Sequence, residues 1–445
     1  MTRTAGRGVA TILLFSGAFA AGVSAAFAQM PLTLEEAMKR ARGATADARA
    51  LASTFDEADA RVRQAQSGFW PRVDLTETVQ RSNNPVFAFS SLLSQRRFTA
   101  ENFAIPSLNH PDPVTNTRTA IGLEQPIFNG GLTTLGVDAA KLGRDMAAAA
   151  REAGGQDLAF RAAQAFVRVL QLEAAVRATD AAVAAAESDR QRARARRDVG
   201  LVTEADVLAV DVHLADMHQR QIAARGDLSV ARIQLAEAVG LPLTDSPMMV
   251  RPRPRSEPGD AESLVREALA SHPNHREADL DIQLADNARR TARAALMPTV
   301  GLQGGWEFNG ATLGDQQSSW LVGAQVRMNL FRGFADTARM TEAHHAHLRA
   351  TAERERVERR IEVDVRTALA QLAAGRAREE AGRAALAQAR ESQRIIRDRY
   401  ESGLATVTDV LRSAEAKLDA GSRATATEMD VILQVVALDR AIGRL

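Results

Sequence analysis

Residues 196–208 read Arg-Arg-Asp-Val-Gly-Leu-Val-Thr-Glu-Ala-Asp-Val-Leu, and residues 399–411 read Arg-Tyr-Glu-Ser-Gly-Leu-Ala-Thr-Val-Thr-Asp-Val-Leu. The two stretches lie 203 positions apart, and the same offset relates residues 128–130 to residues 331–333. Such a constant offset indicates helical rods, because one inserted residue rotates everything after it by about 100°. The chain is therefore a tandem duplication, and its two copies are expected to share one fold.

Upstream of the segment with the constant offset, the two copies differ in length. Pro71 and Pro298 are equivalent but lie 227 positions apart, so the first copy holds 24 extra residues between Pro71 and Phe128. Five prolines between residues 241 and 260 exclude a helix there and mark a linker. We therefore divide the mature chain into a first repeat (29–240), a Pro-rich linker (241–260) and a second repeat (261–445).

Each repeat predicts an opening helix, two strands and a long helical hairpin. The opening helices are expected at about 34–67 and 261–295. The strands are expected at about 71–82, 116–128, 298–309 and 318–331, where apolar residues alternate with polar ones, as they do from Trp320 to Leu330. About ten residues is the length that a tilted strand needs to cross a bilayer. The long helices (132–199 and 335–402) would extend on the order of 100 Å. Each is followed by a return helix (204–239 and 407–442).

The turns between the long helices follow one pattern in both copies. Gly200 and Gly403 end the incoming helices, since glycine adopts the left-handed conformation that closes a helix. Thr203 with Asp206 and Thr406 with Asp409 form capping boxes for the outgoing helices. The predicted tips therefore lie near residues 200 and 403. Each tip also carries an exposed leucine, which is expected to meet a partner surface: Leu201 and Leu404.

Composition excludes several functional classes. The net charge of +1 gives no basic excess for nucleic-acid binding. The absence of cysteine excludes disulfides, thiolate metal sites, a cysteine nucleophile and a lipidated N-terminal cysteine. No catalytic triad order or phosphate-binding loop occurs, and the histidines at 344, 345 and 347 lack the additional ligands of a zinc site. We expect no enzyme activity, no cofactor and no metal.

The N-terminus is typical of an exported protein. Arg3 and Arg7 precede an apolar run that ends in Ala26-Phe27-Ala28, which predicts a signal peptide over residues 1–28. No later stretch has the ~20 apolar residues of a transmembrane helix, so a membrane crossing would have to use strands. Single-chain membrane barrels start at about eight strands, so four strands per chain require several copies. The sequence predicts an obligate oligomer.

These residues resemble the TolC family of outer-membrane efflux channels. The resemblance covers residues 34–445 and is most specific at the two Gly-Leu-x-Thr-x-x-Asp-Val-Leu tips and at Gln-Pro-Ile-Phe-Asn-Gly-Gly, residues 125–131. It implies a mainly α fold with a membrane β-barrel part: a homotrimer whose twelve strands form one barrel in outer-membrane lipid, continued by an α-barrel in the periplasm. It also implies an inner-membrane transporter and a periplasmic adaptor, which would contact the tips at Gly200, Leu201, Thr203, Gly403, Leu404 and Thr406.

The resemblance further implies a gate at the periplasmic end. Asp206 and Tyr400 occupy the positions of a link between neighbouring tip helices, and Asp409 that of an acid lining the aperture. Ala405 and Arg412 depart from the family pattern, which has a link arginine and a second ring acid at these positions. A looser closed state and a weaker cation preference are therefore expected.

Two functions remain open from the sequence. One is an outer-membrane exit duct of a tripartite efflux or type I secretion system, which conducts substrates passively from an inner-membrane pump. The other is a periplasmic coiled-coil adaptor or scaffold without a pore. Two helical hairpins, each with two strands of bilayer length, favour the duct. The long loop at 83–116 is expected to cap the barrel at the cell surface, or to carry its phenylalanines only for its own packing.

Overall fold

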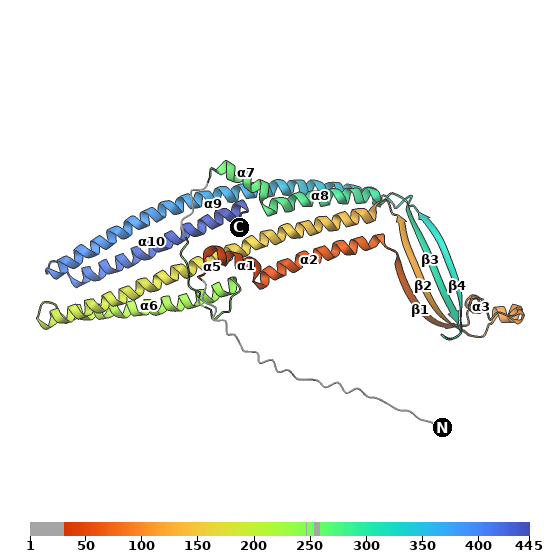
Figure 1. Cartoon of the computed structure of the whole chain (residues 1–445), viewed down its shortest axis with the longest axis horizontal. Helices are drawn as coiled ribbons and strands as arrows, with labels where there is room; N and C mark the ends of the chain where they lie inside the picture. The colour runs from red at the N-terminus through yellow and green to blue at the C-terminus, as the bar shows by residue number, and fades with distance from the viewer. Residues whose placement is uncertain (1–30, 246, 253–258) are drawn as a thin grey trace, which may run out of the picture.

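The structure, a computed structural model, describes residues 31–245, 247–252 and 259–445 (Figure 1). The predicted signal peptide lies outside the described residues, and so do positions 246 and 253–258 of the predicted linker. The molecule is a long rod with a four-stranded sheet at one end and two helical tips at the other. The mainly α fold with a small β part is confirmed by this architecture.

The first repeat contains more helices than its sequence pattern predicted. Its elements are α1 (Leu34–Gly43), α2 (Ala46–Gln66), the short 3₁₀ helix η1 (Ser67–Phe69), β1 (Arg72–Ser82), α3 (Pro85–Ser94), the 3₁₀ helix η2 (Ala100–Phe103), α4 (Ile105–Asn109), β2 (Val114–Phe128), α5 (Leu132–Asp198) and α6 (Glu204–Ala238). The segment expected to be a loop at 83–116 therefore folds largely as helices. Its first helix begins where Asn84 accepts hydrogen bonds from the amides of Val86 and Phe87 and Pro85 supplies a preset φ.

The second repeat has the same order without this insertion. It consists of α7 (Ala261–Ser271), α8 (Pro273–Ala294), β3 (Thr299–Gly310), β4 (Gln316–Arg327), α9 (Ala335–Glu401) and α10 (Val407–Ile442). The long helices α5 and α9 each have 67 residues, which corresponds to about 100 Å.

Both opening helices are broken, which the sequence analysis did not predict. Thr45 ends α1 and caps α2, because its hydroxyl accepts a hydrogen bond from the amide of Ala48 at 3.2 Å. In the second repeat Pro273 starts α8 and excludes helical geometry at His272 before it. Each opening segment is therefore two helices at an angle, and α1 and α7 lie beside the middle of the rod (Figure 1).

The sheet is antiparallel throughout, in the order β1-β2-β3-β4. Strand β2 pairs with β3, so the two repeats meet at its centre, and within the described chain β1 and β4 each leave one edge unpaired. One face is apolar and exposed, and its large side chains are Val73, Leu75, Val79, Ile121, Leu123, Leu302, Trp306, Trp320, Val322 and Val326. The opposite face is mostly polar, and its side chains include Arg72, Asp74, Asn116, Arg118, Glu124, Gln303, Glu307, Asn309 and Gln325.

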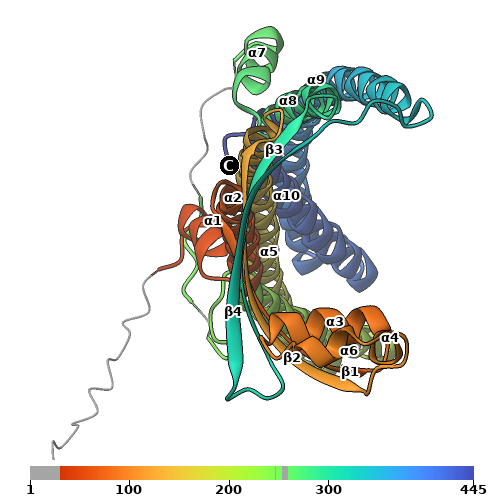
Figure 2. The ribbon, with the colours of Figure 1, turned by 90° about the vertical axis from the view of Figure 1, so that its right-hand side faces the viewer.

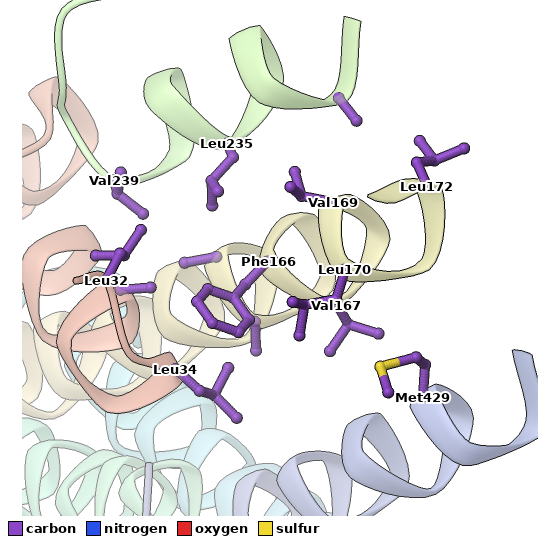
Figure 3. Close-up of a cluster of buried hydrophobic side chains, with 14 of the residues drawn as sticks. Leu32, Leu34, Phe166, Val167, Val169, Leu170, Leu172, Leu235, Val239 and Met429 are labelled. Atoms are coloured by element: carbon purple, nitrogen blue, oxygen red, sulfur yellow. The ribbon is translucent and has the colours of Figure 1, made fainter. Parts of the chain in front are cut away.

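The largest core lies in the middle of the rod, where α1, α5, α6 and α10 meet. Phe166 of α5 is fully buried there, next to Leu34 of α1 and facing the helix that carries Met429 (Figure 3). A second cluster joins α7 to α9 and α10 through Val265, Val365 and Ile442. Among the described residues no helix is long and apolar enough to span a membrane.

Candidate functional site at the helical tips

The two tips are closed by the same backbone geometry. Gly200 and Gly403 both have φ of +75°, where side-chain-bearing residues are strained. At each tip the next amide donates back to the helix: Leu201 N–H to the carbonyl of Arg196 at 2.8 Å, and Leu404 N–H to that of Arg399 at 2.7 Å. These bonds satisfy carbonyls that the end of a helix leaves unpaired.

Each outgoing helix starts with a complete capping box. The Asp206 carboxylate accepts hydrogen bonds from the amide and the hydroxyl of Thr203 at 2.9 and 2.8 Å. Asp409 does the same for Thr406 at 3.0 and 2.7 Å. Hydrogen bonds to the charged form hold the pKa of both carboxyls below the ordinary value. Both acids are therefore ionised at neutral pH.

Asp409 differs from Asp206 in its surroundings. The guanidinium groups of Arg412 and Arg399 lower the pKa of Asp409 further, after the hydrogen bonds from Thr406. Arg412 is exposed one turn along α10, so a fixed positive charge lies beside this acid. The arrangement weakens the negative field that Asp409 alone would create.

Tyr400 is the distinguishing residue of the second tip. Its side chain is 9% exposed, and burial raises the pKa of its hydroxyl. Arg196 of the first repeat lies over the ring, with its guanidinium carbon 4.6 Å from the ring centroid, and donates a hydrogen bond to the Tyr400 carbonyl at 2.9 Å. A cation at the carboxyl end of α9 also interacts favourably with the helix dipole. Arg196 thus joins the end of α9 to α5.

Asp206 and Tyr400 lie in the same tip but are not hydrogen-bonded to each other. The negative charge of Asp206 contributes to the raised pKa of Tyr400, which places the two groups within electrostatic range. The described part of the chain offers the buried Tyr400 hydroxyl no hydrogen-bond partner, and the Asp206 carboxylate is held by Thr203. A direct link between them is absent from the single subunit.

An apolar cluster packs the two tips against each other. It contains side chains from α5, α6, α9 and α10: Ala193, Val207, Val210, Tyr400, Val407 and Val410. Above it, Asp189 of α5 pairs with Arg397 of α9 at 3.4 Å. Neither Arg196 nor this ion pair was predicted from the sequence. Each links residues about 200 positions apart, and Arg196 and Arg399 look alike in the sequence.

The outer surface of the tips is exposed and partly apolar. Leu201 and Leu404 are 66% and 69% exposed. The other four residues predicted to contact an adaptor are exposed as well: Gly200, Thr203, Gly403 and Thr406. All six residues, three at each tip, therefore face solvent.

The chain resembles known proteins over almost its whole length. The sequence profile of the family described as "outer membrane efflux protein" matches residues 37–241 and 264–444. Outer membrane efflux protein BepC of Brucella suis is 27% identical over 345 residues, which are 75% of this chain and 74% of that protein. Protein CyaE of Bordetella pertussis is 28% identical over 347 residues, 75% of this chain and 72% of that protein. The crystal structure of the CmeC outer membrane channel of Campylobacter jejuni aligns with a TM-score of 0.76 and 16% identity, over 92% of this chain and 85% of that one.

Proposed function

The chain belongs to the outer membrane efflux protein family, and from this premise we propose that three copies assemble into one continuous, gated duct. The protein is an outer-membrane exit duct with its helical part in the periplasm. Its family is one of channels rather than enzymes. The comparisons give no support to the alternative of a periplasmic adaptor without a pore.

The architecture of the sheet is the observation that supports a trimer. Within the described residues it has two unpaired edges and one exposed apolar face. Unpaired backbone groups are costly in lipid, and four strands are too few to close a barrel. Three copies bring twelve strands into one closed sheet, with the apolar face toward lipid and the polar face toward the duct.

The tips provide the surface for the partners. A periplasmic adaptor would contact Gly200, Leu201, Thr203, Gly403, Leu404 and Thr406, since exposed leucines at the end of a rod favour an apolar partner surface. An inner-membrane pump would supply the substrates and the energy, while the duct itself stays passive.

The gate lies at the inner side of the same tips. We assign the gate to Asp206, Tyr400 and Asp409. The apolar cluster that packs the two tips against each other, and that includes Tyr400, supports this assignment. In the trimer the Tyr400 hydroxyl gains its hydrogen bond when the tips close. Arg196 positions Tyr400, because it contacts both the ring and the backbone carbonyl of this residue. Opening the duct then requires the tips to separate at this cluster.

The test has two parts on the purified full-length protein. The first is its mass in detergent by light scattering, where a trimer is expected and a monomer or dimer soluble without detergent contradicts the duct. The second is single-channel conductance in planar bilayers. Tyr400→Ala and Arg196→Ala are expected to raise conductance, because each removes a contact that joins the tips.

Arg359→Ala is the control, since Arg359 is an exposed arginine of the same helix α9 and lies far along it from the tip. It should leave the conductance close to that of the unmodified duct. A trimer whose conductance does not respond to Tyr400→Ala or Arg196→Ala would contradict the gate assignment and leave the duct intact. Equal effects of Arg196→Ala and Arg359→Ala would show that only the general charge of the helices matters.

A further inference from the structure

The two hairpins of the sheet end at the same edge of the sheet, the first three residues farther out, and they are joined differently. Ser82 pairs with Val114 at the end of the first hairpin, and Gly310 pairs with Gln316 at the end of the second. Residues 311–315 form a short turn in the second hairpin, whereas residues 83–113 form α3, η2 and α4 in the first. We call residues 83–113 the insert.

The insert is a compact unit with its own small core. Phe98 packs edge-to-face against Phe89 and Phe103, with ring centroids 4.8 and 5.0 Å away. Ala88 and Ser91 of α3 are 1% and 4% exposed. This packing gives the insert a fixed shape at the outer end of the sheet.

Side-chain amides attach the insert to the polar face of the sheet. Gln95, which is 3% exposed at the end of α3, donates hydrogen bonds to the Thr115 carbonyl at 2.8 Å and to the Asn116 side-chain oxygen at 2.9 Å. Asn116 in turn donates to the side-chain oxygen of Asn309 on β3 at 2.9 Å. The three amides connect α3, β2 and β3.

The face to which these amides belong is fixed by the strand register. Arg118 lies opposite Asn309, and Asn116 lies two residues from Arg118, so all three share the polar face. Helix α3 also contacts β3 and β4, so it lies across the sheet. Figure 2 shows α3 and α4 on the side toward which the strands and the long helices curve. The apolar face stays free.

We propose that the insert forms a constriction at the outer mouth of the duct and that Gln95 is the positioning residue that holds it there. The inference rests on the proposed function in one respect, namely that the polar face lines the duct. Three copies would then place three inserts inside one mouth, far from the periplasmic tips. This constriction limits the size of hydrophilic solutes that enter from outside, while small ions and small molecules pass.

The absence of cysteine gives a direct test. The reporter is a single cysteine, Gln303→Cys, on the polar face of β3 and deeper in the sheet than Asn309. The control is a single cysteine at the adjacent position, Leu302→Cys, which lies on the apolar face. Intact cells that express the full chain are treated from outside with a small charged methanethiosulfonate or with a large polyethylene-glycol maleimide. The Gln303→Cys reporter is expected to react with the small reagent and to be protected from the large one.

Removing the constriction should abolish this protection. In one variant residues 82–114 are replaced by residues 310–316 of the same chain, so that the turn keeps Gly310, where a Cβ would clash with the Asp315 carbonyl. In a second, Gln95→Ala removes both hydrogen bonds that the amide donates to β2 and keeps the insert. Large-reagent labelling should rise to the small-reagent level in the first variant and partway in the second, because water replaces neutral hydrogen bonds at small net cost. Gln64→Ala, which changes an exposed glutamine of α2 outside the sheet, should leave the protection unchanged.

The outcomes separate the two proposals. Two results overturn the constriction only. One is labelling by both reagents in the unmodified background. The other is unchanged protection after the insert is replaced, in a trimer that still reacts with the small reagent. Lack of small-reagent labelling at Gln303→Cys together with labelling at Leu302→Cys overturns the assignment of the polar face to the duct, and with it the proposed function.

Discussion

The two tips share every capping contact, yet only the second contains a buried aromatic ring. Position 400 of the second repeat corresponds to Arg197 of the first, which pairs with Glu204 at 3.0 Å on the surface. Arg196 contacts Tyr400, whereas its equivalent Arg399 is exposed. The caps are therefore alike and the contacts between tips are not.

The same division holds at the other end of the long helices. Gly130 and Gly333 are equivalent and both have a positive φ, but a Cβ at Gly130 would lie 2.6 Å from the Ala294 carbonyl oxygen, while a Cβ at Gly333 would meet nothing within 4 Å. Duplication has preserved what each copy needs locally. The copies diverge where each packs against the other.

The largest difference between the repeats is expected in the core. Phe166→Ala should lower the free energy of unfolding by about 3–5 kcal/mol, because this ring of α5 is fully buried in the core that α5 forms with α1, α6 and α10 (Figure 3). The equivalent change Leu369→Ala should cost about 2 kcal/mol, since Leu369 is only partly buried. Urea titration of the detergent-solubilised protein measures both. Equal losses would mean that the two cores are equivalent despite their different burial.

A smaller asymmetry is expected at the paired glycines. Gly333→Ala should cost about 1–2 kcal/mol, the penalty for a side chain in the left-handed region. Gly130→Ala should cost more, because its methyl group also meets the end of α8. The same titration compares the two variants. If Gly333→Ala proved the more damaging, close approach of the backbones at Gly130 would not constrain the fold.

The caps should respond equally in the two repeats. Thr203→Ala and Thr406→Ala each remove one capping box and should cost about 1 kcal/mol. Hydrogen exchange of the first amides of α6 and α10 should accelerate to a similar extent. A clearly larger effect at one tip would show that its threonine has a role beyond capping.

The smallest effect concerns pH. Because the folded-state pKa of Asp206 and of Asp409 is lowered, their stabilisation is fully present above the ordinary carboxyl pKa and is lost as pH falls through the folded pKa. The unfolding midpoints of the unmodified protein and of the double variant Asp206→Asn, Asp409→Asn should differ by a constant amount from neutral pH down to about pH 5, and converge below pH 4. A difference that grows on acidification would contradict the role of these acids as charged caps.

Sequence patterns were sufficient for features that depend on neighbouring residues. The capping boxes join positions three apart, the helix-ending glycines act on their own turn, and the alternation along β4 needs only a strand of a dozen residues. The break at Thr45 is also local. We did not predict it, because a threonine can also lie inside a helix, where its hydroxyl bonds the carbonyl four residues before it. The helices of the insert were missed for a related reason, since short apolar segments rich in phenylalanine carry no clear period.

The tertiary structure decided the contacts between the copies and between the insert and the sheet. Arg196 and Tyr400 are 204 positions apart, and the amides of Gln95, Asn116 and Asn309 come from three elements. Nothing in the sequence separates Arg196 from Arg399, or predicts on which face of the sheet the insert lies. Local geometry is set by backbone sterics and hydrogen bonds within a few residues, so the sequence determines it. The long-range pairs depend on how two nearly identical rods pack together, and only the folded chain specifies that packing.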